Sequence, residues 1–86
     1  MGSQNKQFWY VYIIQTSSGQ LYTGITTDLE RRFAEHQDSP KGAKFFAVSA
    51  PEKIVFQERH PDRSSATRRE AGIKRMTRQE KLQLIH

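Results

Sequence analysis

The stretch WYVYIIQTSSGQLYTGITTDLERRFAEH, residues 9–36, decides how this chain folds. The aromatic and β-branched side chains of residues 8–14 are typical of a central strand, because both faces of that segment are apolar. Residues 15–20 contain Ser-Ser-Gly and predict a hairpin connection, in which Gly19 supplies a backbone angle that other residues avoid. Residues 21–25 are then the returning strand.

Two tyrosines of this hairpin are candidates for a shared site. If the loop holds an odd number of residues, Tyr12 and Tyr22 project from the same face of the hairpin, opposite or diagonal to each other. Two phenols then share one small patch. The alternative is that both are ordinary strand aromatics, with hydroxyls at the edge of the core.

A helix is predicted directly after the hairpin. The segment Thr27-Asp28-Leu29-Glu30 matches a capping box, with Thr27 as the N-cap and a helix that runs to about residue 37. Helical periodicity gives this helix an inward-facing arc formed by Leu29, Phe33 and His36. Arg32 lies on the flank of that arc and also faces the sheet.

The second half of the chain predicts one more strand and two helices. Residues 53–58 form the strand, and residues 43–51 before it have no clear period and are expected to be a loop. A helix begins at Ser64 or Ser65, with an inward stripe of Ala66, Glu70, Ile73 and Thr77. Residues 77–80 match another capping box, so a last short helix docks Leu82 and Ile85.

Length and composition limit the kinds of protein that this can be. Eighty-six residues predict a single domain over residues 8–86, preceded by a disordered segment at residues 1–7. The absence of cysteine excludes disulfides, thiolate zinc sites and nucleophilic thiols. No run is long and apolar enough to span a bilayer. We therefore expect a cytoplasmic monomer without membrane contacts.

The positive charge of the chain is concentrated near its C-terminus. The net charge is +5, and residues 1–58 sum to zero, so residues 59–86 carry all of the excess. One interpretation is a solvated helix face; the other is a surface that binds a polyanion, most plausibly nucleic acid. The residues assigned to that surface are Lys44, Arg68, Arg69, Lys74, Arg75, Arg78 and Lys81.

Glu70, His36 and Arg32 each admit two interpretations. A carboxylate on an apolar stripe needs a partner, so Glu70 either pairs with an arginine such as Arg32 or holds one Mg²⁺ or Mn²⁺ ion. His36 is either a hydrogen-bonded core histidine or a catalytic one. Arg32 faces inward and therefore requires a carboxylate or a phosphate.

A combination of short motifs resembles a known family. Tyr10-Val11-Tyr12, Tyr22-Thr23-Gly24, then Arg32, His36 and the later Glu70 are similar to the GIY-YIG nuclease superfamily, especially to its small single-domain bacterial, UPF0213-like branch. The resemblance implies an α+β fold in the order ββαβαα, with a three-stranded antiparallel sheet flanked by about three helices. It also implies metal-dependent hydrolysis of phosphodiester bonds in DNA.

The resemblance assigns roles to individual residues. Tyr12, Tyr22, Arg32 and His36 occupy the family's catalytic positions, Gly24 its structural glycine, and Glu70 its metal-ligand glutamate for one Mg²⁺ or Mn²⁺ ion. Tyr12 would orient or deprotonate the attacking water, with its pKa lowered by Arg32 or by the metal.

The chain departs from the family pattern at three places. Tyr10 stands where the first motif has glycine, no asparagine follows Glu70, and Phe45-Phe46-Ala47-Val48 follows Lys44 where tyrosine and basic residues are usual. Two other functions stay open: a nucleic-acid-binding module without catalysis, and a protein-interaction domain. Low sequence specificity is expected, with a protein partner as one source of selectivity.

Overall fold

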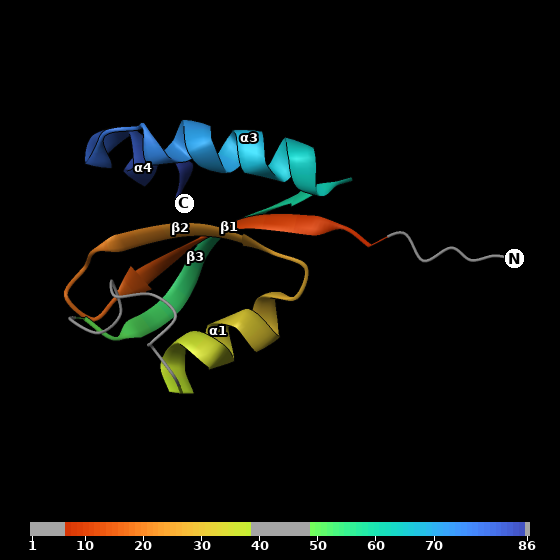
Figure 1. Cartoon of the computed structure of the whole chain (residues 1–86). Helices are drawn as coiled ribbons and strands as arrows, with labels where there is room; N and C mark the ends of the chain where they lie inside the picture. Colours follow the sequence, from red (N-terminus) through yellow and green to blue (C-terminus); the bar gives the residue numbers. More distant parts are fainter. Residues whose placement is uncertain (1–6, 39–48, 86) are drawn as a thin grey trace, which may run out of the picture.

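The computed structural model describes residues 7–38 and 49–85 and has an α+β architecture. Its elements follow the predicted order ββαβαα: β1 (Trp9–Thr16), β2 (Leu21–Thr26), α1 (Leu29–Asp38), β3 (Pro51–His60), α3 (Arg63–Lys74) and α4 (Arg78–Leu84). The strands form an antiparallel sheet in the order β2-β1-β3. Figure 1 shows α3 and α4 on one face of this sheet and α1 on the other. The predicted fold class is therefore confirmed.

Strand β1 is central, as its apolar faces predicted, and its alternating side chains supply two separate cores. Val11 and Ile13 are completely buried against Ala66 and Ile73 of α3. Tyr12 and Ile14 point to the opposite face and form a second cluster beside α1. One strand thus places an aliphatic core on one side of the sheet and a tyrosine-containing core on the other.

The hairpin between β1 and β2 has a three-residue loop, which is the odd length that the prediction required. Thr16 N donates to Gln20 O at 2.9 Å, and Gly19 N donates to Thr16 O at 2.9 Å. Gly19 has φ = 88°, a left-handed conformation that favours glycine. Tyr12 therefore pairs with Gly24 and Ile14 with Tyr22, which puts both tyrosines on one face.

The start of α1 differs by one residue from the prediction. Asp28, not Thr27, is the N-cap: its Oδ1 accepts the Arg31 N–H at 3.1 Å, and its carbonyl accepts the Arg32 N–H at 3.0 Å. The preceding Thr26 Oγ1 accepts the Asp28 N–H at 3.1 Å. The Asp28 carboxylate and carbonyl accept the free N–H groups of the first turn, so the capping box expected for Thr27 and Glu30 did not form.

The C-terminal helices follow the prediction at one cap and differ at the other. Asp62 caps α3 by accepting the Ser65 N–H at 2.8 Å, so this helix begins at Arg63, slightly earlier than predicted. Thr77 and Glu80 form the predicted capping box of α4. Since Thr77 is an exposed cap, it does not belong to the inward stripe of α3.

The docking residues of α4 are only partly those predicted. Ile85 packs against the aliphatic core as expected, together with Leu84 and Met76. Leu82 does not dock: its side chain is 44% exposed. The helix has seven residues, about two turns, and Leu84 packs against the aliphatic core, which leaves Leu82 on its outer side.

The strands are longer than predicted, since pairing with β1 extends their ends. Strand β3 spans Pro51–His60 and contains a shift in register between Ile13 and Ile14 of β1. The expected loop at residues 43–51 and the expected disordered segment at residues 1–7 lie almost entirely outside the described residues. None of the described helices is long and apolar enough to cross a membrane.

Candidate active site

Three rings meet on the α1 face of the sheet. Tyr12 comes from β1, Tyr22 from β2 and His36 from the last turn of α1, and each lies within 6.4 Å of the others between ring centroids. The Tyr12 hydroxyl and His36 Nε2 are 3.2 Å apart and form a buried hydrogen bond. His36 is only 2% exposed, as its place on the inward arc of α1 predicted.

Gly24 makes room for the phenol of Tyr12. A Cβ added at Gly24 would stand 2.5 Å from the Tyr12 hydroxyl and 2.7 Å from its Cζ, which is too close for any side chain. The end of the Tyr12 ring therefore rests on the backbone of β2, which is an edge strand. Glycine at this position fixes where the hydroxyl sits, and this is its structural role.

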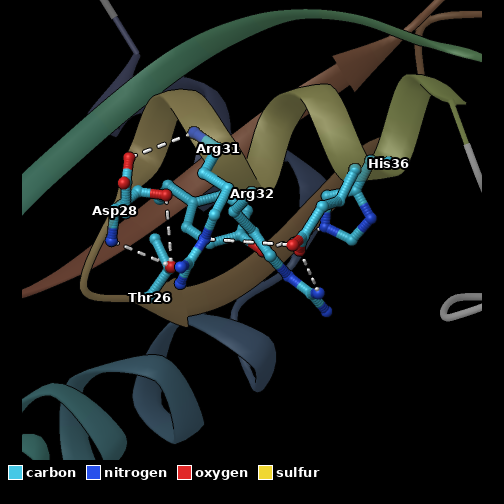
Figure 2. A network of polar contacts seen from close by, with 7 residues as sticks. Thr26, Asp28, Arg31, Arg32 and His36 are labelled. Carbon is cyan, nitrogen blue, oxygen red and sulfur yellow. Dashed lines mark hydrogen bonds and ion pairs between the residues drawn. The ribbon is translucent and has the colours of Figure 1, made fainter.

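Arg32 lies at the rim of the ring cluster. Its guanidinium Nη1 donates to Glu35 Oε1 at 3.1 Å, and Arg31 Nε is 3.8 Å from the other oxygen of the same carboxylate. Figure 2 shows Arg31, Arg32 and His36 along α1, with Asp28 at its start. The Arg32 side chain is 37% exposed, so it can reach both the phenol and a ligand in solvent.

Burial controls the protonation of Tyr12 and His36. Burial raises the pKa of Tyr12 to about 12; the nearby Arg32 opposes this rise, and the charges of Tyr22 and Glu70 add to it. Arg32 lowers the pKa of Tyr12, as expected, but burial has the larger effect, so Arg32 alone does not make Tyr12 a usable base. Burial, followed by Arg32, lowers the pKa of His36. At neutral pH both groups are uncharged.

Glu70 reaches the site from the other layer of the molecule. It belongs to α3, which packs against the face of the sheet opposite to α1, yet its carboxylate is close enough to raise the pKa of Tyr12. Helix α3 contacts β2, which is an edge strand of the sheet. Glu70 Oε2 pairs with Lys74 Nζ at 3.2 Å. The alternative pairing of Glu70 with Arg32 is not found among the described residues.

The carboxylate of Glu70 fits a hard divalent ion that keeps most of its waters. Residues 7–38 and 49–85 contain no cluster of three His, Cys, Asp or Glu side chains that could enclose a metal. A single carboxylate suits Mg²⁺ or Mn²⁺, which accept few protein ligands. Separately, the hydroxyl of Thr23, which is 4% exposed and on the α3 side of β2, has no hydrogen-bond partner among the described residues.

The predicted nucleic-acid-binding residues divide into two groups. Arg69 Nε donates to Glu58 Oε1 at 3.0 Å, and Arg68 Nη1 donates to Ser64 Oγ at 2.8 Å, so both are held by neighbours, as Lys74 is by Glu70. In the described chain Arg75, Arg78 and Lys81 have no acidic partner. Lys44 lies outside the described residues.

Sequence reasoning did not identify Thr23, Glu35 or Gln20 as functional. Thr23 stands inside the Tyr-Thr-Gly triplet, and that position was a usable signal. Glu35 follows Arg31 and Arg32 at helical spacing, but its pairing with both arginines was not predicted. Gln20 lines a basic hollow with Arg78, and no local pattern brings these two residues together, since they are far apart in sequence.

The chain is similar to known proteins over most of its length. The family model described as the GIY-YIG catalytic domain matches residues 8–83. The UPF0213 protein DP2720 of Desulfotalea psychrophila is 44% identical over 77 residues, which cover 90% of this chain and 70% of that protein. The UPF0213 protein YhbQ of Escherichia coli K12 is also 44% identical over 77 residues, covering 90% of this chain and 76% of that protein.

A solved structure resembles this fold. The solution NMR structure of the UPF0213 protein BH0048 from Bacillus halodurans is 39% identical in sequence and superposes with a TM-score of 0.57. The match covers 90% of this chain and 81% of that one.

Proposed function

Because this chain belongs to the GIY-YIG catalytic-domain family, we propose that it is a divalent-metal-dependent endonuclease that hydrolyses phosphodiester bonds in DNA. The observation that carries the proposal is the buried Tyr12–His36 pair, whose hydroxyl rests on Gly24 at the edge of the sheet. A small chain has little reason to bury such a polar pair for stability alone, since burying polar groups lowers the free energy of unfolding.

Glu70 is the residue that would hold the metal. One Mg²⁺ or Mn²⁺ ion supplies charge neutralisation at a non-bridging phosphate oxygen and at the departing 3′-oxygen. To bind it, the carboxylate has to exchange its pairing with the Lys74 ammonium, which then becomes available to a neighbouring phosphate.

Tyr12 and His36 would activate water together. With its pKa raised to about 12, the Tyr12 phenol is neutral and is a poor base by itself. His36 is neutral too, so Nε2 can accept the Tyr12 proton while the phenol oxygen takes one from the attacking water. This relay requires the His36 tautomer that carries its proton on Nδ1. Tyr22 positions the same water from β2.

Arg32 would stabilise the charge that builds on the phosphoryl group. Its guanidinium is partly exposed beside Tyr12, and its pairing with Glu35 at 3.1 Å holds it in place from the solvent side. A fork of N–H donors fits two phosphate oxygens at once, which a lysine ammonium cannot do.

The basic C-terminal region would bind the backbone of the DNA, so affinity depends on salt more than on sequence. The domain lacks a second recognition element in its described residues, and we expect a monomer of low intrinsic specificity. A protein partner is one way in which selectivity is added.

The experiment is cleavage of plasmid and single-stranded DNA with Mg²⁺ or Mn²⁺. Tyr12→Phe and Glu70→Ala should abolish cleavage, whereas the matched variants Tyr10→Phe and Glu52→Ala should retain it. Tyr10 is on the same strand, and Glu52 is exposed on β3. Cleavage that survives in both site variants would show that this site is not the catalytic one.

A second candidate is a nucleic-acid-binding module without turnover. The pairing of Glu70 with Lys74 and the lack of an asparagine after Glu70 favour it, because both reduce the donors available to a metal. Salt-sensitive DNA binding with no cleavage under Mg²⁺, Mn²⁺ or Co²⁺ would select this function. Binding to an acidic protein but not to DNA at low salt would instead select a protein-interaction domain.

A further inference from the structure

A basic hollow lies away from the ring cluster, between the start of β2 and α4. It has a volume of about 250 Å³ and is lined by Gln20, Leu21, Arg78 and Lys81. Arg78 Nη2 is 4.0 Å from the place that a Cβ would take at Gly19, so the guanidinium extends over the hairpin turn. Lys81 follows Arg78 by three residues, which puts both side chains on one side of α4.

The chemistry of the hollow suits one anion. In the described residues, neither Arg78 nor Lys81 forms a salt bridge, whereas Arg32, Arg69 and Lys74 each pair with a carboxylate. Glu80, the acid nearest to them in sequence, is engaged in the capping box of α4. A guanidinium, an ammonium and the Gln20 amide can together bind the oxygens of a phosphate.

The lining of the hollow argues for a phosphate and against a base. Among the described residues that line it, three are polar or charged and Leu21 is the one apolar residue. None of these four residues offers an aromatic face on which a base could stack.

The hollow and the proposed site lie at different places on β2. Leu21 and Gly24 are three residues apart, which corresponds to about 10 Å along the strand. Leu21 packs against the aliphatic cluster on the α3 face, whereas Tyr12, whose hydroxyl lies against Gly24, belongs to the cluster on the α1 face. Among the described strands β2 pairs with β1 alone, so a nucleic-acid strand that contacts both places would cross its other edge.

We propose that this hollow anchors a single backbone phosphate of the substrate, separate from the phosphate that is cut beside Gly24. This inference rests on the proposed function for the position of the cut, although not for the existence of the anchor. The anchor fixes one point of the strand relative to β2 and so helps to place the scissile phosphate without reading a base.

The first experiment measures binding alone. The affinity of a short labelled DNA duplex is compared between the unmodified chain and the Arg78→Gln/Lys81→Gln variant, without divalent metal. We expect about tenfold weaker binding at low salt and a salt slope smaller by about one for each lost contact. The matched control is Lys53→Gln/Arg63→Gln, which removes one ammonium and one guanidinium at exposed positions outside both the hollow and the predicted nucleic-acid-binding surface. An equal loss in the control would overturn the anchor.

The second experiment locates the contacted phosphate. Substrates that carry one neutral methylphosphonate, moved stepwise along the strand, are tested for cleavage with Mn²⁺. A substitution at one position away from the cut should slow cleavage by the unmodified chain and by the control variant, and should have little further effect on Arg78→Gln/Lys81→Gln. An unchanged positional effect in that variant would refute the anchor.

The two proposals can fail separately. If no substrate is cleaved, the endonuclease function is wrong, and the same methylphosphonate series read by affinity still tests the anchor. If cleavage occurs but no single phosphate matters, the endonuclease stands and the anchor is wrong.

Discussion

The two faces of the sheet differ in composition and in proposed role, although β1 contributes side chains to both. On the α3 face, Val11 and Ile13 of β1 pack with Ala66 and Ile73 into an aliphatic cluster that is fully buried. On the α1 face, Tyr12 of the same strand shares a smaller cluster with polar rings. Stability therefore depends mainly on the odd-numbered residues of β1, and the proposed chemistry on the even-numbered residue between them.

This division allows function and folding to be disturbed independently. A substitution on the α3 face should change the free energy of unfolding and leave each folded molecule equally active. A conservative substitution on the α1 face should do the reverse. The following predictions test whether the two faces separate in this way, beginning with the largest effect on stability.

Ile13→Ala should cost the most stability. Its side chain is completely buried among aliphatic neighbours, so truncation leaves a cavity and lowers the free energy of unfolding by about 2–5 kcal/mol. Urea denaturation followed by circular dichroism measures this. The matched control is exposed Leu82→Ala, which should change little. If the folded fraction of Ile13→Ala loses specific nuclease activity, the two faces are not independent.

Gly24→Ala should disturb both properties. The added methyl group would stand 2.5 Å from the Tyr12 hydroxyl, and the ring cannot move away easily because it is buried and bonded to His36. We expect a loss of about 1–3 kcal/mol, as for other overpacked sites, together with loss of cleavage. Gly72→Ala is the control, because its Cβ would meet no atom within 4 Å. A fully active Gly24→Ala variant would contradict the assigned role of the glycine.

Tyr12→Phe should separate activity from stability most clearly. It removes one hydroxyl and keeps the ring, so the free energy of unfolding should fall by only about 0.5–1.5 kcal/mol. Loss of the proton relay should reduce the rate of cleavage by about 10²–10⁴-fold. Rates measured on protein shown to be folded by near-ultraviolet circular dichroism decide the matter. A large stability loss with unchanged activity would assign Tyr12 to the scaffold.

The smallest expected effect is the dependence of stability and cleavage on pH. It arises from His36 on the α1 face and requires no substitution. The pKa of His36 is lowered from 6.5 in the folded chain, so below about pH 6.5 the unfolded chain binds a proton that the folded chain resists. The contribution of His36 to stability is complete above that pH and is lost as the pH falls. Cleavage should decline over the same range, because protonated His36 cannot accept the Tyr12 proton.

The control for this prediction is His36→Gln, since other ionisable groups also contribute to the stability of the chain in acid. The difference between the unfolding curves of the two proteins isolates His36. Parallel pH dependence in both would show that the imidazole is not held neutral by burial.

The fold could be predicted from the sequence because the local strand and helix patterns match the elements that the sheet and its helices require. The paired tyrosines, the inward arc of α1 and the capping box at Thr77 were all readable from spacing, and each is found. The N-cap of α1 was misplaced because Thr27 and Asp28 are both good caps, and only tertiary contacts choose between them. Leu82 was expected to dock because periodicity in a helix of this length defines its inner face poorly.

The electrostatic part of the site could not be predicted in the same way. The raised pKa of Tyr12 depends on how deeply its hydroxyl is buried, and the pairings of Glu70 and Arg32 depend on competing partners within each helix. Lys74 follows Glu70 by one helical turn, so that pair was available from the sequence, but its preference over Arg32 was not. Which cations converge on Gln20 depends on how α4 packs against the hairpin.

The three-residue turn at Gly19 also has a kinetic consequence. Tyr12 and Tyr22 are only ten residues apart in the chain and are brought together by the hairpin. The two tyrosines of the site can therefore meet as soon as the hairpin closes, within about 1–10 μs. The carboxylate of Glu70 arrives only after a far longer loop has been closed. We therefore expect the aromatic half of the site to form early during folding and the ion-binding half to be completed last.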